Sequence, residues 1–480
     1  MPPSPPAPDA ARQHPTRTLL ILAIGAVSFA LAQTMIIPAL PAIQERTGVS
    51  EATVTWLLTA FLIVSSVATP LVGRLGDMFG KERLLVIVLL LFAAGSAICA
   101  VGTSSIELMV AGRVVQGAAG ALFPLSFGII RDEFPRERVA QSIGLISSTF
   151  GIGGGAGLVL SGVFVDHLSL AALFWLAFGV TIVAAWATWR YVPESPVRAP
   201  ARIDWVGGLL LALSLSTLLV GVSRGPDWGW SSGGVLGLIA AGLALALAFV
   251  GWERRVPEPM VDMALMARRA VWSTNLAAFA IGFAMFGSFI LIPQLTQAPE
   301  STGYGFGLNA TQAGLVMVPS SIVMLFAGPL SGWLSTRFGS RLPLAVGSGF
   351  SVVSFVVLAS AHEHIWTIAF GTALLGVGIA LAFAAMANLV VAAVPATQVG
   401  VATGINTIMR SIGGAVGGQI AASLLASHLL VSGLPAESGY TSAFAMSGAA
   451  ALVALAVCAI VPSSRPKRRA DVGAPARAAA

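Results

Sequence analysis

The chain has 480 residues, of which 56% are hydrophobic and only 10% carry a charge, and its mean hydropathy is +0.88. This composition excludes a water-soluble globular protein, because so few charged side chains cannot cover a soluble surface of this size. The formal net charge of +6 comes from basic residues spread over short loops, which fits membrane topology better than nucleic-acid binding. The sequence therefore predicts a polytopic membrane protein that binds no nucleic acid.

Apolar runs follow one another through most of the chain. A membrane helix needs about 20 mostly apolar residues, because lipid offers the backbone no hydrogen-bond partner. We predict an all-α protein with about fourteen such helices. The predicted spans are residues 18–43, 53–73, 83–103, 107–129, 141–163, 168–190, 205–223, 233–252, 274–297, 311–333, 342–361, 365–391, 399–428 and 440–462. The Pro-rich residues 1–17 are predicted to be a disordered tail, and residues 463–480 a basic tail.

The distribution of basic residues predicts the orientation in the membrane. Lys and Arg lie at the N-terminus and in every second loop, whereas the alternate loops contain only Arg46 and Arg224. Positively charged loops stay on the cytoplasmic side, so we expect both termini to be cytoplasmic. Arginine greatly outnumbers lysine, which is typical of GC-rich bacterial genomes and suggests a bacterial inner (cell) membrane.

Similar segments recur in the two halves of the chain at one constant offset. Residues 68–85, ATPLVGRLGDMFGKERLL, align without gaps with residues 327–344, AGPLSGWLSTRFGSRLPL. At the same offset Gly117 meets Gly376, and Gly154 meets Gly413. Duplicated halves are typical of secondary transporters.

The repeat also predicts where additional helices lie. Each repeated span is shifted by eight spans, whereas a plain duplication of six helices would shift it by six. Two helices must therefore lie between the bundles. We expect an N-terminal six-helix bundle at 18–190, a linker with two membrane helices at 191–273, and a C-terminal six-helix bundle at 274–462.

Three motifs carry a family resemblance. They are GRLGDMFGKER at 73–83 in the loop after the second span, LMVAGRVVQGAAGA at 108–121 in the fourth span, and GIGGGAGLVLSG at 151–162 in the fifth. They resemble the signature loop, the fourth-helix motif and the antiporter motif of the major facilitator superfamily. The helix number and the DWVG segment at 204–207 are similar to those of its fourteen-helix drug:proton antiporter family. The resemblance implies a multidrug or antibiotic efflux protein that works by alternating access, without a cofactor and as a monomer.

The signature loop has a physical reading of its own. Its glycines allow helix ends to approach closely, and Asp77 can accept from a helix N-terminus or pair with a cation such as Arg131. Such a contact would latch one conformation and break in another. The alternative is that the charges only mark a cytoplasmic turn. The predicted latch residues are Gly73, Asp77, Gly80, Lys81, Arg83 and Arg131.

Arginine, and not a carboxylate, lies deep in the predicted spans. None of the 20 acidic residues is deep in a span, and Ala32 stands where the resemblance would place an acid. An intramembrane arginine is costly and should face a cavity or a partner. Arg410 could equally be structural and bind helix carbonyls. The predicted transport and coupling residues are Arg113, Gln116, Gly117, Arg410, Gln33 and Glu107.

Glycines and polar or aromatic residues supply the remaining candidates. Small residues spaced along one face bring membrane helices together. The predicted packing glycines are Gly153, Gly157, Gly162, Gly413 and Gly417. The predicted cavity residues are Asn275, Gln294, Asn388, Asn406, Phe123 and Phe286, although a phenylalanine can equally face lipid.

The candidate functions differ in what the chain would move. The main prediction is an exporter of small lipophilic compounds that exchanges them for protons. Alternatives are a dedicated exporter of one metabolite or natural product, or a sensor or assembly protein on the same fold.

No catalytic constellation and no phosphate-binding loop occur in the sequence, so we predict no enzyme. The His362-Glu363-His364 stretch has no third ligand, so we predict no metal site. Without an acid in the membrane, substrates should be neutral, zwitterionic or anionic more readily than cationic.

Overall fold

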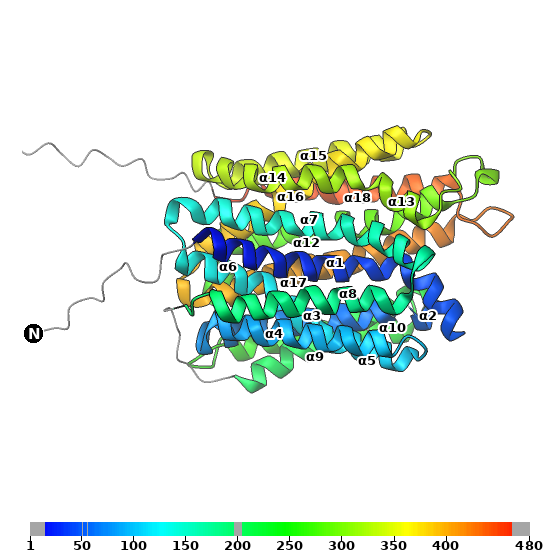
Figure 1. Ribbon diagram of the computed structural model, residues 1–480. Coiled ribbons are helices and arrows are strands. Elements are labelled where there is room, and N and C mark those ends of the chain that lie inside the picture. The colour runs from blue at the N-terminus through cyan, green and yellow to red at the C-terminus, as the bar shows by residue number, and fades with distance from the viewer. Residues whose placement is uncertain (1–14, 50, 55, 196–203, 463–480) are drawn as a thin grey trace, which may run out of the picture.

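The computed structural model describes residues 15–49, 51–54, 56–195 and 204–462. Long helices run side by side, and the described chain begins and ends at the same end of the bundle (Figure 1). We call this the basic end, because the arginine-rich loops lie there. Most of both predicted tails falls outside the described residues.

The first part of the chain forms six long helices. The fourth of them is interrupted by a short 3₁₀ turn. The elements are α1 (Pro15–Thr47), α2 (Glu51–Val54), α3 (Trp56–Phe79), α4 (Lys81–Val101), α5 (Ile106–Gly117), η1 (Ala118–Ala121), α6 (Leu122–Glu133), α7 (Arg136–His167) and α8 (Leu170–Tyr191).

A helical hairpin, a short linker helix and six more long helices follow. The hairpin is α9 (Trp205–Trp228) and α10 (Gly233–Glu253). The remaining elements are α11 (Met263–Met266), α12 (Arg269–Gln297), η2 (Glu300–Thr302), α13 (Ala310–Val316), α14 (Val318–Phe338), α15 (Arg341–Ser360), α16 (Ile365–Ala393), η3 (Ala396–Gln398), α17 (Val399–Ser427) and α18 (Glu437–Val457).

The predicted spans correspond to these long helices. Among the described residues, 13 helices are long and apolar enough to cross a membrane, counting α5 to α6 and α13 to α14 as one each. The remaining predicted span, residues 399–428, corresponds to α17, a helix of 29 residues that is richer in glycine and contains Arg410.

Polar residues stop the apolar runs at the membrane surfaces. Ser105, Ser169 and Ser232 cap α5, α8 and α10 by accepting from a backbone N–H in the first turn. Asp204 caps α9 in the same way through Gly207. Because a side-chain oxygen satisfies a free amide there, each helix can begin at the edge of its apolar stretch.

Two seams join the first and second sets of six helices. In the first set α1 packs on α7 and α4 on α8, and in the second α12 packs on α17 and α15 on α16. Between the sets, α7 contacts α14 and α3 contacts α17. The α9 helix packs on α3 and α17, and α10 packs on α9. The domain boundaries proposed from the sequence remain a prediction.

Glycines bring the backbones together at both seams. A Cβ on Gly73 would lie 2.7 Å from the carbonyl oxygen of Gly400, and one on Gly332 would lie 2.5 Å from that of Ala140. Gly144 and Gly328 each leave room for the carbonyl oxygen of the other, at 2.4 Å from the missing Cβ. The two sets of helices are thus in backbone contact, which a side chain at these positions would prevent.

The predicted packing glycines lie at helix crossings. Gly153 and Gly157 bring α7 against α1, and Gly413 and Gly417 bring α17 against α12. Gly162 differs, because it makes room for Thr311 and so lies where α7 meets the start of α13.

Gly417→Ala should lower the thermal stability of the purified protein. Its Cβ would lie 2.2 Å from the carbonyl oxygen of Phe283, and such overpacking costs about 1–3 kcal/mol. Gly418→Ala is the matched control, because the nearest atom to its Cβ is the Ile290 Cδ1 at 3.4 Å. Equal melting temperatures for the two variants in detergent would contradict this account of the α12–α17 crossing.

Candidate functional site

Asp77 lies where the two sets of helices meet at the basic end. It is in the last turn of α3 and is fully buried. Its carboxylate faces the backbone N–H of Val401 in the first turn of α17, without a hydrogen bond of good geometry among the described residues. A Cβ on Gly400 would lie 3.0 Å from the Asp77 Oδ2 atom. A negative charge is thus held at the positive end of a helix from the other half.

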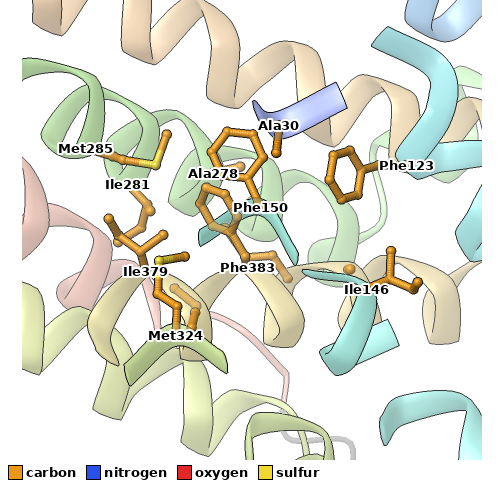
Figure 2. Packing of buried hydrophobic residues seen from close by; sticks show 14 of the residues in the cluster. Ala30, Phe123, Ile146, Phe150, Ala278, Ile281, Met285, Met324, Ile379 and Phe383 are labelled. Carbon is orange, nitrogen blue, oxygen red and sulfur yellow. The ribbon is translucent and has the colours of Figure 1, made fainter. Parts of the chain in front are cut away.

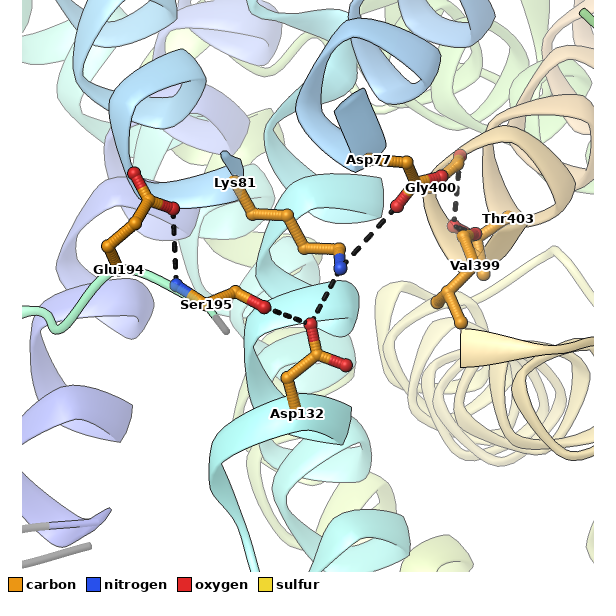
Figure 3. Close-up of polar contacts among 8 residues, drawn as sticks. All are labelled: Asp77, Lys81, Asp132, Glu194, Ser195, Val399, Gly400 and Thr403. Carbon is orange, nitrogen blue, oxygen red and sulfur yellow. Dashed lines mark hydrogen bonds and ion pairs between the residues drawn. The ribbon is translucent and has the colours of Figure 1, made fainter. Parts of the chain in front are cut away.

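Lys81 connects Asp77 to a second buried acid. The Lys81 Nζ atom lies 2.6 Å from the Asp132 Oδ2 atom and 3.5 Å from the Asp77 Oδ1 atom. Ser195 also donates to Asp132 (Figure 3). Gly128 on α6 makes room for the lysine stem, because a Cβ there would lie 2.7 Å from the Lys81 Cδ atom. Lys81, which the sequence places in a loop, is therefore buried and connects α3, α4 and α6.

Glu194, which follows α8, contacts two other residues of the signature loop, Gly80 and Arg83. Gly80 has a φ of 118°, a conformation that favours glycine. A Cβ on Gly80 would lie 2.5 Å from the Glu194 Oε2 atom. The Arg83 Nε atom lies 3.5 Å from the same carboxylate, with the arginine side chain 67% exposed.

Arg131 does not hold the place that the sequence suggested for it. Asp77 forms its ion pair, within the described residues, with Lys81 of its own loop. Arg131 is half-buried near both Asp77 and Asp132 and forms no ion pair with either among the described residues. Lys81, rather than Arg131, pairs with the acids because it lies at the start of α4, four residues after Asp77.

Arg113 lies inside the first set of helices and away from the seams. Its Nε atom donates to the Leu57 carbonyl oxygen at 2.9 Å, and its Nη1 atom donates to the Gln116 Oε1 atom at 2.7 Å. Gln116 donates onward to Ser96, and the guanidinium lies 4.2 Å from the centroid of the Phe61 ring. Gly117 makes room for Val64 on α3. The fully buried arginine thus ties α5 to α3 and α4.

A pocket lies between the two halves. Helices α6 and α7 line one side and α16 and α17 the other. Its volume of about 370 Å³ includes space that is open to solvent, and only a small part of it is wide enough for a water molecule. The lining residues are Phe123, Phe127, Ser147, Phe150, Phe383, Ala387, Thr403, Asn406, Thr407 and Arg410.

Aromatic rings continue from this pocket into both halves. The Phe123 and Phe150 ring centroids are 6.0 Å apart, and those of Phe150 and Phe383 are 5.8 Å apart across the seam (Figure 2). Such rings offer a compact apolar surface that can tilt to accept different shapes. The pocket combines this surface with a few polar groups, as small-molecule sites do.

The predicted cavity residues divide between the pocket and its surroundings. Phe123 and Asn406 line it. Asn275 stands behind Asn406 and accepts from its amide at 3.0 Å. Asn388 instead donates to the Ala140 carbonyl oxygen at the α7–α16 contact. The remaining two do not line the pocket: Phe286 packs beside Phe289 and Gly414, and Gln294 is exposed.

Two predicted coupling residues lie elsewhere. Gln33 is half-buried on α1, and its Oε1 atom has no hydrogen-bond partner among the described residues. Glu107 is exposed in the first turn of α5, at the end opposite the basic end, and accepts from Ser105 at 2.7 Å. Neither lines the pocket.

Sequence reasoning missed Asp132, Ser147, Phe150 and Thr407. The repeat contained a signal for one of them, because Ser147 and Asn406 are separated by the same offset as Gly73 and Gly332, and both line the pocket. Asp132 follows Arg131 at the end of α6. Its ion pair with Lys81 depends on the packing of α4 against α6, which the sequence does not show.

Comparison with known proteins agrees with this geometry. The sequence profile of the Major Facilitator Superfamily matches residues 22–297 and 274–479. The Tetracenomycin C resistance and export protein of Streptomyces glaucescens is 29% identical over 82% of this chain and 73% of its own. The multidrug resistance protein Stp of Mycobacterium tuberculosis is 28% identical over 81% of this chain and 72% of its own.

A solved structure extends the likeness to three dimensions. The human organic anion transporter MFSD10 (TETRAN) superposes with a TM-score of 0.68 over 95% of this chain and 100% of that chain. At 17% identity this shows the fold alone. The predicted all-α major facilitator fold and the family resemblance are confirmed, and the superfamily consists of transporters and not of enzymes. This chain belongs to the Major Facilitator Superfamily and is a multi-pass membrane transporter.

Proposed function

We propose that the protein is a secondary active exporter of small lipophilic compounds that exchanges them for protons. The observation that carries this proposal is the aromatic pocket between the halves, beside a contact that closes the basic end. The names of its relatives, resistance and export proteins for tetracenomycin C and for multiple drugs, support the same class of substrate.

The two seams support the proposal of alternating access. If Asp77 leaves the N-terminus of α17, the α3–α17 seam can open and expose the pocket at the basic end. When the contact forms again, that end closes. We propose that the basic end is cytoplasmic, as the distribution of arginine indicates, and that the protein works as a monomer in a bacterial cell membrane.

Proton coupling needs a titratable group near the moving parts. No acid lines the pocket among the residues that the structure describes, and Glu107 is exposed outside it. Asp77 is buried at the contact between the halves, so we propose that it carries the proton, with a protonatable substrate as the alternative carrier.

Reconstituted vesicles test the function directly. Purified protein in liposomes with an imposed pH gradient should move several uncharged and charged lipophilic dyes, and collapse of the gradient should stop net movement. Transport of a single compound from a broad panel would favour a dedicated exporter. Absence of transport for the whole panel would support a sensor or assembly protein instead.

A further inference from the structure

Arg410 is a cation that faces the pocket between the halves. It lies on α17 among the lining residues, with its Cζ atom 4.3 Å from the centroid of the Phe383 ring. No ion pair joins it to a carboxylate, and no hydrogen bond to a carbonyl, in the part of the chain that the structure describes. Its counterpart in the first half, at the repeat offset, is Gly151. The charge therefore belongs to one side of the pocket only.

The surroundings of Arg410 differ from those of Arg113, the other arginine that lies deep in a predicted span. Arg113 donates to Leu57 and Gln116 and also contacts the Phe61 ring. Arg410 has the ring contact alone. A ring face is worth about 0.5–2 kcal/mol to a cation, whereas a charge within the membrane costs several kcal/mol unless it has a partner. The guanidinium donors of Arg410 remain open to a ligand.

Ser147 provides a second, independent donor on the opposite wall. It is 3% exposed on α7, lines the pocket, and its Oγ atom has no hydrogen-bond partner among the described residues. A buried hydroxyl without a partner is costly. Arg410 and Ser147 come from different halves, so one acceptor group placed between them would satisfy donors from both.

We infer that the pocket is a binding site for organic anions, with Arg410 as the counter-charge. The ligand class is a compound with one carboxylate, sulfonate or phenolate group and an aromatic or apolar body. The anionic group would accept from the Arg410 guanidinium and the Ser147 hydroxyl, and the body would lie against Phe123, Phe150 and Phe383. This inference rests on the proposed function, since it names the substrate class of the same pocket.

Three anthracene probes of matched size test the charge preference. They are anthracene-2-sulfonate, anthracene-2-carboxamide and an anthracenylmethyl trimethylammonium ion, and their fluorescence reports binding to the purified full-length protein. Because a buried charge pair is worth tenfold or more in affinity, the sulfonate should bind about tenfold more tightly than the ammonium ion. R410Q should weaken sulfonate binding by about tenfold or more and change carboxamide binding by less than about twofold.

Further variants separate charge from packing. R410K should retain part of the sulfonate affinity, and S147A should lower it by about threefold, because one neutral hydrogen bond is lost. The control R337Q removes an exposed arginine that lies over Trp333 outside the pocket, and it should leave every probe unchanged.

The outcomes distinguish this site from the broader function. Equal weakening of sulfonate and carboxamide by R410Q, or a wild-type preference for the ammonium ion, would overturn the anion site. If the vesicles nevertheless move other compounds, the exporter proposal survives alone. If no compound is moved but sulfonate binding depends on Arg410, the site stands and the exporter proposal fails.

Discussion

Replacing Asp77 by asparagine should lower transport by about two- to thirtyfold while the protein still folds and inserts. A carboxylate at a helix N-terminus is worth about 0.3–2 kcal/mol, and 1.4 kcal/mol changes an equilibrium about tenfold. The Asp77 carboxylate faces the first turn of α17 from the other half. Loss of its charge should therefore shift the protein toward a conformation open at the basic end.

Efflux rates in cells and cysteine labelling together check this expectation. A cysteine at Thr407, which lines the pocket, should react faster with an impermeant thiol reagent applied at the basic end when Asp77 is changed. Thr336→Ala is the matched control, because Thr336 occupies the corresponding place in the second half without a carboxylate. Normal efflux by the asparagine variant would show that Asp77 is not a latch.

Lys81→Met should destabilise the fold more than any loss of an exposed charge. It would leave Asp77 and Asp132 buried without their shared cation, and removal of one member of a buried pair costs about 3–5 kcal/mol. Arg83→Met is the control, since its pair with Glu194 has the arginine side chain 67% exposed and is worth about 0–1 kcal/mol.

Melting temperature and the yield of monodisperse protein in detergent measure both effects. The double variant Lys81→Met, Asp132→Asn should recover part of the lost stability, because one buried charge is removed with its partner. An unchanged melting temperature in Lys81→Met would mean that the half-buried Arg131 replaces the lysine.

The sequence predicted the fold well because lipid leaves the backbone few choices. Each long apolar run had to become a helix, and the structure places Gly73 and Gly332, which the repeat relates, at the two contacts between the sets of helices. The burial of Lys81 was not predictable, because it depends on how closely α4 approaches Gly128 on α6. Arg131 was one of the partners considered for Asp77, and the structure pairs Asp77 with Lys81 instead.

The pocket was only partly predictable. Phe123 and Asn406 were proposed from residue type and depth, and both line it. Gln294 and Phe286 satisfied the same criteria but lie elsewhere, because depth in a span does not say which way a side chain faces. For Arg410 the sequence left a structural role open, and the structure shows that, among the described residues, it lacks the hydrogen bonds that hold Arg113.

The glycine contacts of the two seams lie at equivalent positions of the repeat, but at one pair of equivalent positions a buried acid stands beside only one of these two contacts. Gly73 meets Gly400, and Gly332 meets Ala140 and Gln141, which lie at the repeat offset from Val399 and Gly400. At the position of Asp77 the second seam has Thr336. We therefore expect a change in the charge of Asp77 to act on the α3–α17 seam, whereas Thr336, at the corresponding position of the α7–α14 seam, has no group that titrates near neutral pH.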